Sequence, residues 1–320
     1  MFILLKILYF SDILFPMKKI VLLSLLCFIF ANAAFQTAHA SFVSDKVSRM
    51  EQKKTEKREA KEIKKFFSKF IALANKHDVE AIKPLFIDSY MNNDGFNKEI
   101  YFKSVKETWE DCSDLTYKIK ILSMDINGSF ANVTIDEVAT GTVYDNTEIG
   151  PLAGEIHSKS REIYHLTKVS GQWLIAGETV ISDESSLLYG DARFMNISLL
   201  APSQVSASEE YTVTVKIDAE PDSYVVGSIS QDPVTYPAVN SDPPLRVFPE
   251  TQVLERVLKA NTDNLNEYAV SSMAISKTKN VGIDTMRVYM AGLACIMKRV
   301  NVIPKNNYVK SEEEDENNDM

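Results

Sequence analysis

The residues best suited to acid–base chemistry lie in the middle third of the chain. His165 stands between Ile163 and Thr167 in an alternating stretch, so its ring shares one strand face with them. A neutral imidazole there would act as a general base or a ligand donor, because its ordinary pKa lies close to neutral pH. A histidine packed on a sheet with one hydrogen bond explains the same pattern, and both interpretations stay open. Glu137 is a second candidate base, although a carboxylate on a long strand commonly faces solvent.

The sequence gives no support to metal or nucleotide chemistry. The chain has four histidines and three cysteines, and none of them stands in an H-x₃-H or C-x₂-C spacing. Glycine-rich phosphate loops and the G-x-S-x-G elbow are also absent. We therefore predict no cofactor and no metal. Cys112 and Cys295 lie far apart in the sequence, and either a disulfide or two separate thiols fits them.

Length and charge narrow the class of protein. With 320 residues the chain has room for two domains, and its 45% hydrophobic and 25% charged residues are typical of globular proteins. The net charge of −9 argues against a nucleic-acid partner, because phosphate binding needs concentrated Lys and Arg. Residues 306–320 end in an acidic run, which we interpret as a disordered tail. Calcium or a basic partner would also suit such a run.

The N-terminus has the three parts of a secretory signal. A basic start at Met17-Lys18-Lys19 is followed by an apolar run over residues 20–31 and by the small-residue site Ala38-His39-Ala40. The run is too short to cross a bilayer as a helix, so we expect cleavage before Ser41 and no transmembrane span in the mature chain. We expect translation to start at Met17. An uncleaved anchor made by both apolar runs of residues 1–40 remains the alternative.

Helical patterns follow a charged leader over residues 41–57. Apolar residues recur at helical spacing between Ile63 and Ala74, which predicts a helix with one buried face. Asp78 is suited to cap a second, short helix, whose regularity Pro84 limits. A third helix is predicted over about 98–111.

After Cys112 the hydrophobic period changes from helical to alternating. The pattern predicts four long strands, over about 115–121, 131–144, 161–169 and 172–181. Asn127-Gly128 and Ser170-Gly171 are turn sequences between them. The order of helices first and antiparallel strands afterwards predicts an α+β fold, with a bent sheet around a long helix.

These elements resemble the nuclear transport factor 2-like superfamily over roughly residues 58–188. The resemblance rests on "FIALANKHDVEAIKPLFIDSY" (70–90) and "REIYHLTKVSGQWLIAGETV" (161–180), with the hairpin pattern K-x-x-G-x-W-x-I at its end. The superfamily has a cone-shaped fold and includes ketosteroid isomerases, polyketide cyclases, scytalone dehydratase and many non-catalytic binding domains. The resemblance implies a cavity at the open end of the cone.

The catalytic relatives further imply an acidic or histidine base and a tyrosine or protonated-acid donor inside that cavity. Polar residues of this chain that could point inward are Tyr90, Trp109, Glu137, Tyr164, His165 and Glu178. As catalytic candidates we name His165 and Glu137, and as ligand-pocket candidates the other four together with His165. The residue pairs of the catalytic relatives do not map onto this sequence.

A polar stretch over residues 182–191 is interpreted as a linker to a second domain. Beyond it, strand patterns over about 195–200, 211–218, 223–230, 268–275, 285–291 and 295–303 predict a β-sandwich over residues 194–305. It resembles immunoglobulin-like accessory domains of exported bacterial proteins, without their Cys…Trp…Cys core. A proline-rich loop covers 232–249, and residues 250–259 fit either a strand or a short helix.

Two classes of function remain open. The first is an exported bacterial binding protein, non-catalytic, whose cone domain holds a small apolar ligand or docks on an envelope protein, with a homodimer left open. The alternative is an isomerase, dehydratase or cyclase-type enzyme. A cavity with two ionisable groups in reach of one point would favour the enzyme, and one filled by aromatic side chains would favour a scaffold.

Overall fold

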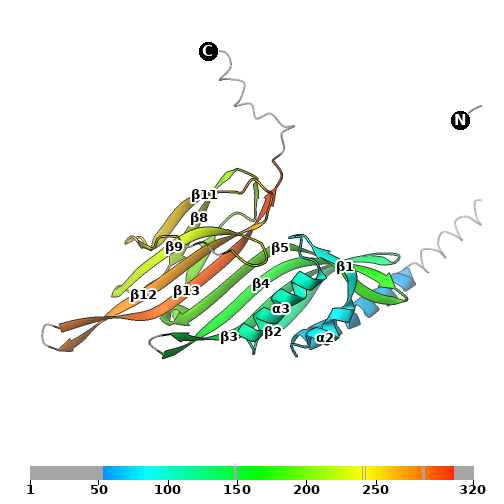
Figure 1. The fold of residues 1–320 in the computed structure, drawn as a ribbon, viewed down its shortest axis with the longest axis horizontal. Coiled ribbons are helices and arrows are strands. Elements are labelled where there is room, and N and C mark those ends of the chain that lie inside the picture. The colour runs from blue at the N-terminus through cyan, green and yellow to red at the C-terminus, as the bar shows by residue number, and fades with distance from the viewer. Residues whose placement is uncertain (1–52, 148–149, 240, 242, 283–284, 306–320) are drawn as a thin grey trace, which may run out of the picture. The chain divides into compact units, whose positions relative to one another are not determined.

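The computed structural model describes residues 53–147, 150–239, 241, 243–282 and 285–305. Almost all described residues belong to one compact unit, residues 60–320 (Figure 1). The predicted signal region, most of the charged leader and the acidic tail lie outside the described residues. Among the residues described, no helix combines the length and the apolar character that crossing a membrane requires.

The helices form where their sequence patterns predict them. Residues 53–74 are helical, and the apolar face between Ile63 and Ala74 is buried. Asp78 caps α2 (Val79–Ile82) by accepting a hydrogen bond from the backbone N–H of Ala81 at 3.0 Å. Pro84 lies in the following 3₁₀ turn, η1 (Lys83–Leu85). The longer helix α3 (Lys98–Asp111) begins after Asn97, whose side chain accepts from the N–H of Ile100 at 2.9 Å.

Four long strands form the antiparallel sheet that the alternation predicts. They are β2 (Thr116–Asn127), β3 (Phe130–Thr147), β4 (Gly150–Val169) and β5 (Gln172–Gly190), and each pairs with the next. Gly128 and Gly171 adopt positive φ in the two predicted turns, which favours glycine there. A further strand, β1 (Phe86–Asn92), pairs parallel to β5 and was not predicted.

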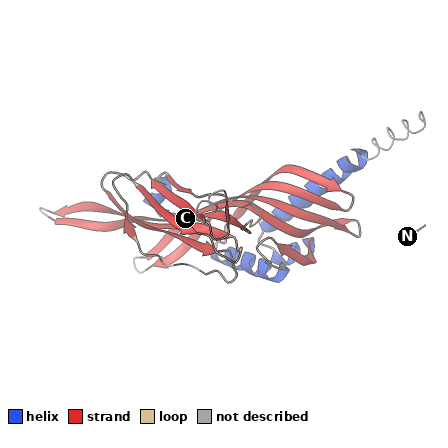
Figure 2. Cartoon of the chain, turned by 90° about the horizontal axis from the view of Figure 1, so that it is seen from above, coloured by secondary structure: helices blue, strands red, loops and turns tan. Residues whose placement is uncertain are grey.

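The helices pack on one face of this sheet and bury a first apolar core. Figure 1 shows α3 over β3, β4 and β5, and Figure 2 shows the helices beside the strands from above. The core includes Phe67 and Phe70 from the first helix, Trp109 from α3 and Ile135 and Ile175 from the sheet. The predicted combination of helices with a bent antiparallel sheet is confirmed.

The predicted linker at residues 182–191 is wrong. Residues up to Gly190 continue β5, which pairs with β4 on one side and β13 (Thr285–Ile303) on the other. The polar side chains that suggested a loop find partners on neighbouring strands. Glu184 forms an ion pair with Lys298 at 2.6 Å, and Asp183 accepts a hydrogen bond from Tyr268 at 2.7 Å. Paired in this way, polar residues do not interrupt the strand.

The C-terminal residues form a second apolar core between two sheets. The strands β9 (Ser223–Pro233), β10 (Arg246–Val247), β12 (Glu267–Gly282) and β13 extend the large sheet beyond β5, and β7 (Gln204–Ser206) pairs with β13. The strands β6 (Ile197–Leu200), β8 (Glu210–Ile217) and β11 (Val253–Lys259) form the smaller one. A short 3₁₀ turn, η2 (Asp191–Phe194), precedes β6.

Two finer expectations for this region are corrected. Residues 253–259 are a strand, so the helix alternative is wrong, because each of them pairs with β8. The two predicted strands at 285–291 and 295–303 are one strand, because Gly292 pairs across to both Ile275 and Gly190 without ending the ladder.

Candidate functional site

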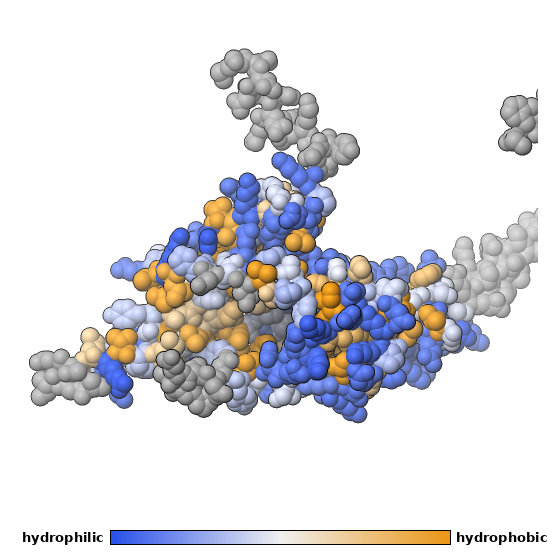
Figure 3. Space-filling model, viewed as in Figure 1, coloured by the Kyte–Doolittle hydropathy of each residue, from blue (hydrophilic) through white to orange (hydrophobic). Residues whose placement is uncertain are grey.

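A small cavity lies between the helices and the sheet. Its volume is about 90 Å³, which exceeds the space of a single water molecule and is well below the roughly 300 Å³ of a typical drug-sized site. It is lined by Phe70, Ile71, Ala74, Ile82, Tyr101, Phe102, Val105, Trp109, Tyr117, Glu137, Glu162, Tyr164 and Glu178. Figure 3 shows that the outer surface over α3 is mostly hydrophilic.

Three glutamate side chains line the cavity, and strand alternation explains the inward direction of two of them, Glu137 and Glu162. On β3, Glu137 shares its face with the buried Ile135 and Ala139. On β4, Glu162 and Tyr164 are both buried and are two residues apart, so they point to the same side.

The third carboxyl group reaches the cavity because of a β-bulge in β5. Leu166 pairs with Ile175 and His165 pairs with Gly177, which leaves Ala176 without a partner on β4. A bulge shifts the alternation by one residue. Glu178 therefore points to the same side as Ile175 and lies opposite Tyr164.

The polar groups around the cavity are partly bonded to one another. Tyr90 donates a hydrogen bond to Oε2 of Glu178 at 2.9 Å, from its buried position behind that carboxyl group. Trp109 donates through Nε1 to the hydroxyl of Tyr117 at 2.9 Å. Ser160 donates to Oε1 of Glu162. The carboxyl groups of Glu162 and Glu178 are themselves hydrogen-bonded.

Two polar groups at the cavity have no partner among the described residues. They are the carboxyl group of Glu137 and the hydroxyl of Tyr101. Both belong to residues that line the cavity, one from the sheet and one from α3. The cavity therefore presents free hydrogen-bonding capacity from two opposite sides.

Burial raises the pKa of every acid in this cluster. Desolvation is the largest cause for Glu137, Glu162 and Glu178. The negative charge of Glu162 further raises the pKa of both Glu137 and Glu178, and that of Asp183 further raises the pKa of Glu162. The two hydrogen-bonded carboxyl groups of Glu162 and Glu178 share a proton, because a carboxylate has no hydrogen with which to donate the bond between them.

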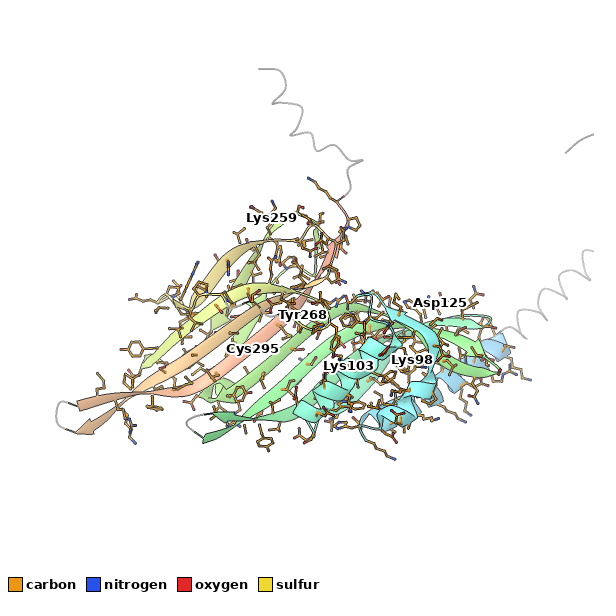
Figure 4. The ribbon with its side chains drawn as sticks, viewed as in Figure 1. Lys98, Lys103, Asp125, Lys259, Tyr268 and Cys295 are labelled. Atoms are coloured by element: carbon orange, nitrogen blue, oxygen red, sulfur yellow. The ribbon has the colours of Figure 1, made fainter. Side chains whose placement is uncertain are left out.

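No basic side chain lines the cavity. Lys98 and Lys103, which Figure 4 labels on α3, have partners elsewhere. Lys98 donates to the carbonyl oxygen of Phe86 at 2.9 Å and pairs with Asp88, and Lys103 lies over the ring of Tyr236. Among the described residues that line the cavity, none is therefore a cation that could offset the charge of the acids.

Five of the six residues predicted to point inward lie in or beside the cavity. Trp109, Glu137, Tyr164 and Glu178 line it, and Tyr90 is hydrogen-bonded to Glu178.

The prediction that His165 shares the cavity is wrong. Its neighbours Tyr164 and Leu166 are buried in the core, so alternation turns His165 to the other face of β4. There Nδ1 contacts Oδ1 of Asn132 at 2.8 Å and Nε2 contacts Oγ1 of Thr179 at 2.9 Å. Partial burial lowers the pKa of this imidazole. His165 is a structural residue of the outer sheet face.

Three residues with polar side chains at the site were not among the predicted ones. Glu162 stands two positions before Tyr164, and the same alternation that placed Tyr164 inside would have placed it there too. Tyr101 lies eight residues before Trp109 on α3, close to two full helical turns, and so shares its face. Tyr117 shares a face of β2 with Ile119, and that spacing was already visible in the sequence.

The described part of the chain contains neither a candidate metal site nor a disulfide bond. No group of three or more His, Cys, Asp or Glu side chains is placed there to hold a metal ion. Cys112 and Cys295 are free thiols, the first of them buried.

Comparison with known proteins finds similarity of fold over a minor part of the chain. No family model and no curated protein matches. A scytalone dehydratase-like protein from Novosphingobium aromaticivorans is 16% identical, with a TM-score of 0.34, over 39% of this chain and 85% of its own. A conserved protein from Planctomyces limnophilus is 12% identical, with a TM-score of 0.33, over 38% and 94%. A nuclear transport factor 2-like superfamily protein from Salmonella enterica is 18% identical, with a TM-score of 0.31, over 38% and 87%.

One fold can carry many unrelated functions, so the role of this cavity must be argued from its own residues.

Proposed function

We propose that this protein binds a small molecule in the cavity between the helices and the sheet. The observation that carries the proposal is the meeting of Glu137, Glu162 and Glu178 around one small, partly open space with aromatic walls. The aromatic side chains suit an apolar body, and the carboxyl groups suit a polar head that donates hydrogen bonds.

The energetics of burial support a binding role. Removing a carboxyl group from water is unfavourable unless partners replace the lost hydration, and three such groups here share few partners. Hydrophobic residues of similar size would stabilise the fold more. A ligand that bonds to the free groups of Glu137 and Tyr101 would offset this penalty.

Blocking the cavity tests the proposal. Val105→Phe adds bulk at the cavity wall, and Val257→Phe adds the same bulk on β11, where Val257 is 60% exposed. Both variants and the wild type are purified from the native host, and small molecules that co-purify are identified by mass spectrometry. We expect a ligand with the wild type and the Val257 variant only. Equal recovery from all three proteins would contradict the proposal.

The setting of this function is a further part of the proposal. We expect the protein to be exported, cleaved before Ser41, and located in the periplasm or outside the cell. The second core would then form an immunoglobulin-like β-sandwich that docks on an envelope protein or on a second copy. N-terminal sequencing of the mature product checks the export step, because a product that begins at Met17 and stays membrane-bound would contradict it.

A specific observation favours a second candidate, an isomerase or dehydratase-type enzyme. The hydrogen-bonded pair of Glu162 and Glu178 combines a proton acceptor with a proton donor, and Tyr90 donates to the second of them. Incubating the co-purifying molecule with the protein in D₂O distinguishes the candidates. Deuterium incorporation or conversion that Glu178→Gln abolishes would favour the enzyme, and an unchanged molecule would favour binding alone.

A further inference from the structure

We infer that the ligand class of this cavity is a small organic cation, an alkylammonium group with a short apolar body. The inference rests on the proposed binding function and gives it a chemical class. It follows from the lining of the cavity, where carboxyl groups and aromatic rings meet without a basic side chain.

Charge complementarity excludes an anion and favours a cation over a neutral ligand. The charged and titratable groups that face the cluster come from every surrounding element: Tyr90 (β1), Tyr101 (α3), Tyr117 (β2), Glu137 (β3), Glu162 and Tyr164 (β4), and Glu178 with the more distant Asp183 (β5). All of them are neutral or negative. A positive head group is the one charge that all these groups would stabilise.

The aromatic walls point to the same class. Tyr101 and Trp109 line the space from α3, and Tyr117 lines it from β2, in the sheet that carries the carboxyl groups. Aromatic faces attract organic cations, most strongly when both are removed from water. An inorganic divalent ion would instead need several oxygen ligands in a defined geometry, and the described residues offer no such arrangement.

The free groups of the cavity provide the contacts for an ammonium head. Glu137 and Tyr101 each have unused hydrogen-bonding capacity, and an ammonium group has three N–H donors. The volume of about 90 Å³ limits the buried part of the ligand to a few non-hydrogen atoms.

Binding would be coupled to proton release. Burial raises the pKa of these carboxyl groups. Where such a group holds a proton before the cation enters, it loses that proton on binding, so that the carboxylate faces the ammonium and one proton passes to solvent. The affinity should therefore increase with pH, up to about tenfold per unit while one proton is released per cation bound. The alkylammonium itself stays charged below about pH 10.

Calorimetric titration of the purified full chain tests the inference. The probes are n-butylammonium and 1-butanol, which have the same number of non-hydrogen atoms and differ in charge. Titrations in two buffers of different ionisation enthalpy count the protons released. We expect butylammonium to bind at least about tenfold more tightly than 1-butanol and to release protons at pH 7.

Matched variants locate the site. Glu137→Gln should weaken butylammonium binding at least about tenfold, since it removes a charge that can face the cation. Asp125→Asn changes the net charge equally at an exposed position of β2 and should leave binding unchanged (Figure 4). Equal loss in both variants would mean a non-specific charge effect and would overturn the inference.

The experiment separates the failure of the inference from that of the function. If 1-butanol binds as tightly as butylammonium without proton release, and Val105→Phe abolishes this binding, the cation class is wrong while the cavity still binds. If neither probe distinguishes the wild type from Val105→Phe, the inference and the proposed function both lose their support.

Discussion

Acidic side chains are buried in two regions of this molecule, and the two regions treat them differently. In the second core, Glu267 is 2% exposed and accepts hydrogen bonds from the backbone N–H of Asn261 at 2.8 Å, from its amide at 2.7 Å and from Tyr211 at 3.2 Å. At the cavity, Glu162 and Glu178 are buried, whereas Glu137 is half-buried and has no hydrogen-bond partner among the described residues. The sequence uses the same residue type in both places, so the difference lies in what the surroundings provide.

The buried side chain of Arg299, like that of Glu267, has its full set of partners within the protein. Arg299 on β13 pairs with both carboxylate oxygens of Asp94, at 2.5 and 3.0 Å, and donates to Asn301 at 2.8 Å. Asn266 also donates to Asp94. A buried charge whose partners all lie within the protein is typical of a structural role, because those contacts replace its lost hydrogen bonds to water. The incomplete pairing around the cavity is what the proposed ligand would complete.

The largest expected loss of stability comes from removing the carboxylate that pairs with the buried Arg299. Asp94→Ala leaves Arg299 buried without its counter-ion and should lower the free energy of unfolding by about 3–5 kcal/mol. Urea denaturation measures the loss. The matched control is Glu155→Ala, which breaks the more exposed pair with Arg193 and should cost less than about 1 kcal/mol. Equal losses would mean that burial does not distinguish the two pairs.

The same substitution should act differently in the two regions. Glu267→Gln places an amide N–H₂ group among donors and should destabilise the fold by about 2 kcal/mol. Glu137→Gln removes an acid that is costly to bury and displaces no hydrogen bond, so it should be neutral or stabilising by about 1 kcal/mol at pH 8. Thermal unfolding of the three proteins compares them. A destabilised Glu137→Gln protein would show that the cavity acid has a structural partner.

The pH dependence of stability should sharpen the contrast further. Because the folded-state pKa of Glu137 is raised, the folded protein holds a proton there that the unfolded chain releases above about pH 4.3. The stability from this proton is fully present below the unfolded pKa and is lost as pH rises through the folded pKa. The advantage of Glu137→Gln over the wild type should therefore grow with pH, by at most about 1.4 kcal/mol per unit. Denaturation at pH 5, 6, 7 and 8 measures it, and a constant difference would contradict the assigned shift.

The sequence predicts the elements of this fold better than it predicts which strand face is inside. Strict alternation placed the four long strands, and helical spacing placed the first helix and α3, because those periods follow directly from backbone geometry. The prediction of a linker over residues 182–191 failed because its polar side chains find partners on strands that are distant in the sequence. One such partner is Lys298 on β13.

For the candidate site, too, the sequence did not predict which face of a strand points inward. Tyr164 and His165 were both predicted to point inward, yet adjacent strand residues point to opposite faces. Only the position of the helices, which a local pattern does not contain, decides between them. The inward direction of Glu178 depends in addition on the bulge at Ala176, and a strict period of two would have turned it outward from Trp173 and Ile175.

The smallest expected change in stability is that of a variant at His165. This variant tests whether the two faces of β4 have separate roles. His165→Gln keeps a side chain that can bond to Asn132 and Thr179, so stability at pH 7 should change by less than about 0.5 kcal/mol. Because partial burial lowers the folded-state pKa of His165, the stability from the neutral imidazole is present above the unfolded pKa of about 6.5 and is lost as pH falls through the folded value. The variant should lose less stability than the wild type between pH 7 and 5, and its binding of butylammonium should match the wild type across that range. A change in binding as large as that of Glu137→Gln would mean that the outer face of β4 communicates with the cavity, and the division between a structural and a ligand-binding face would have to be abandoned.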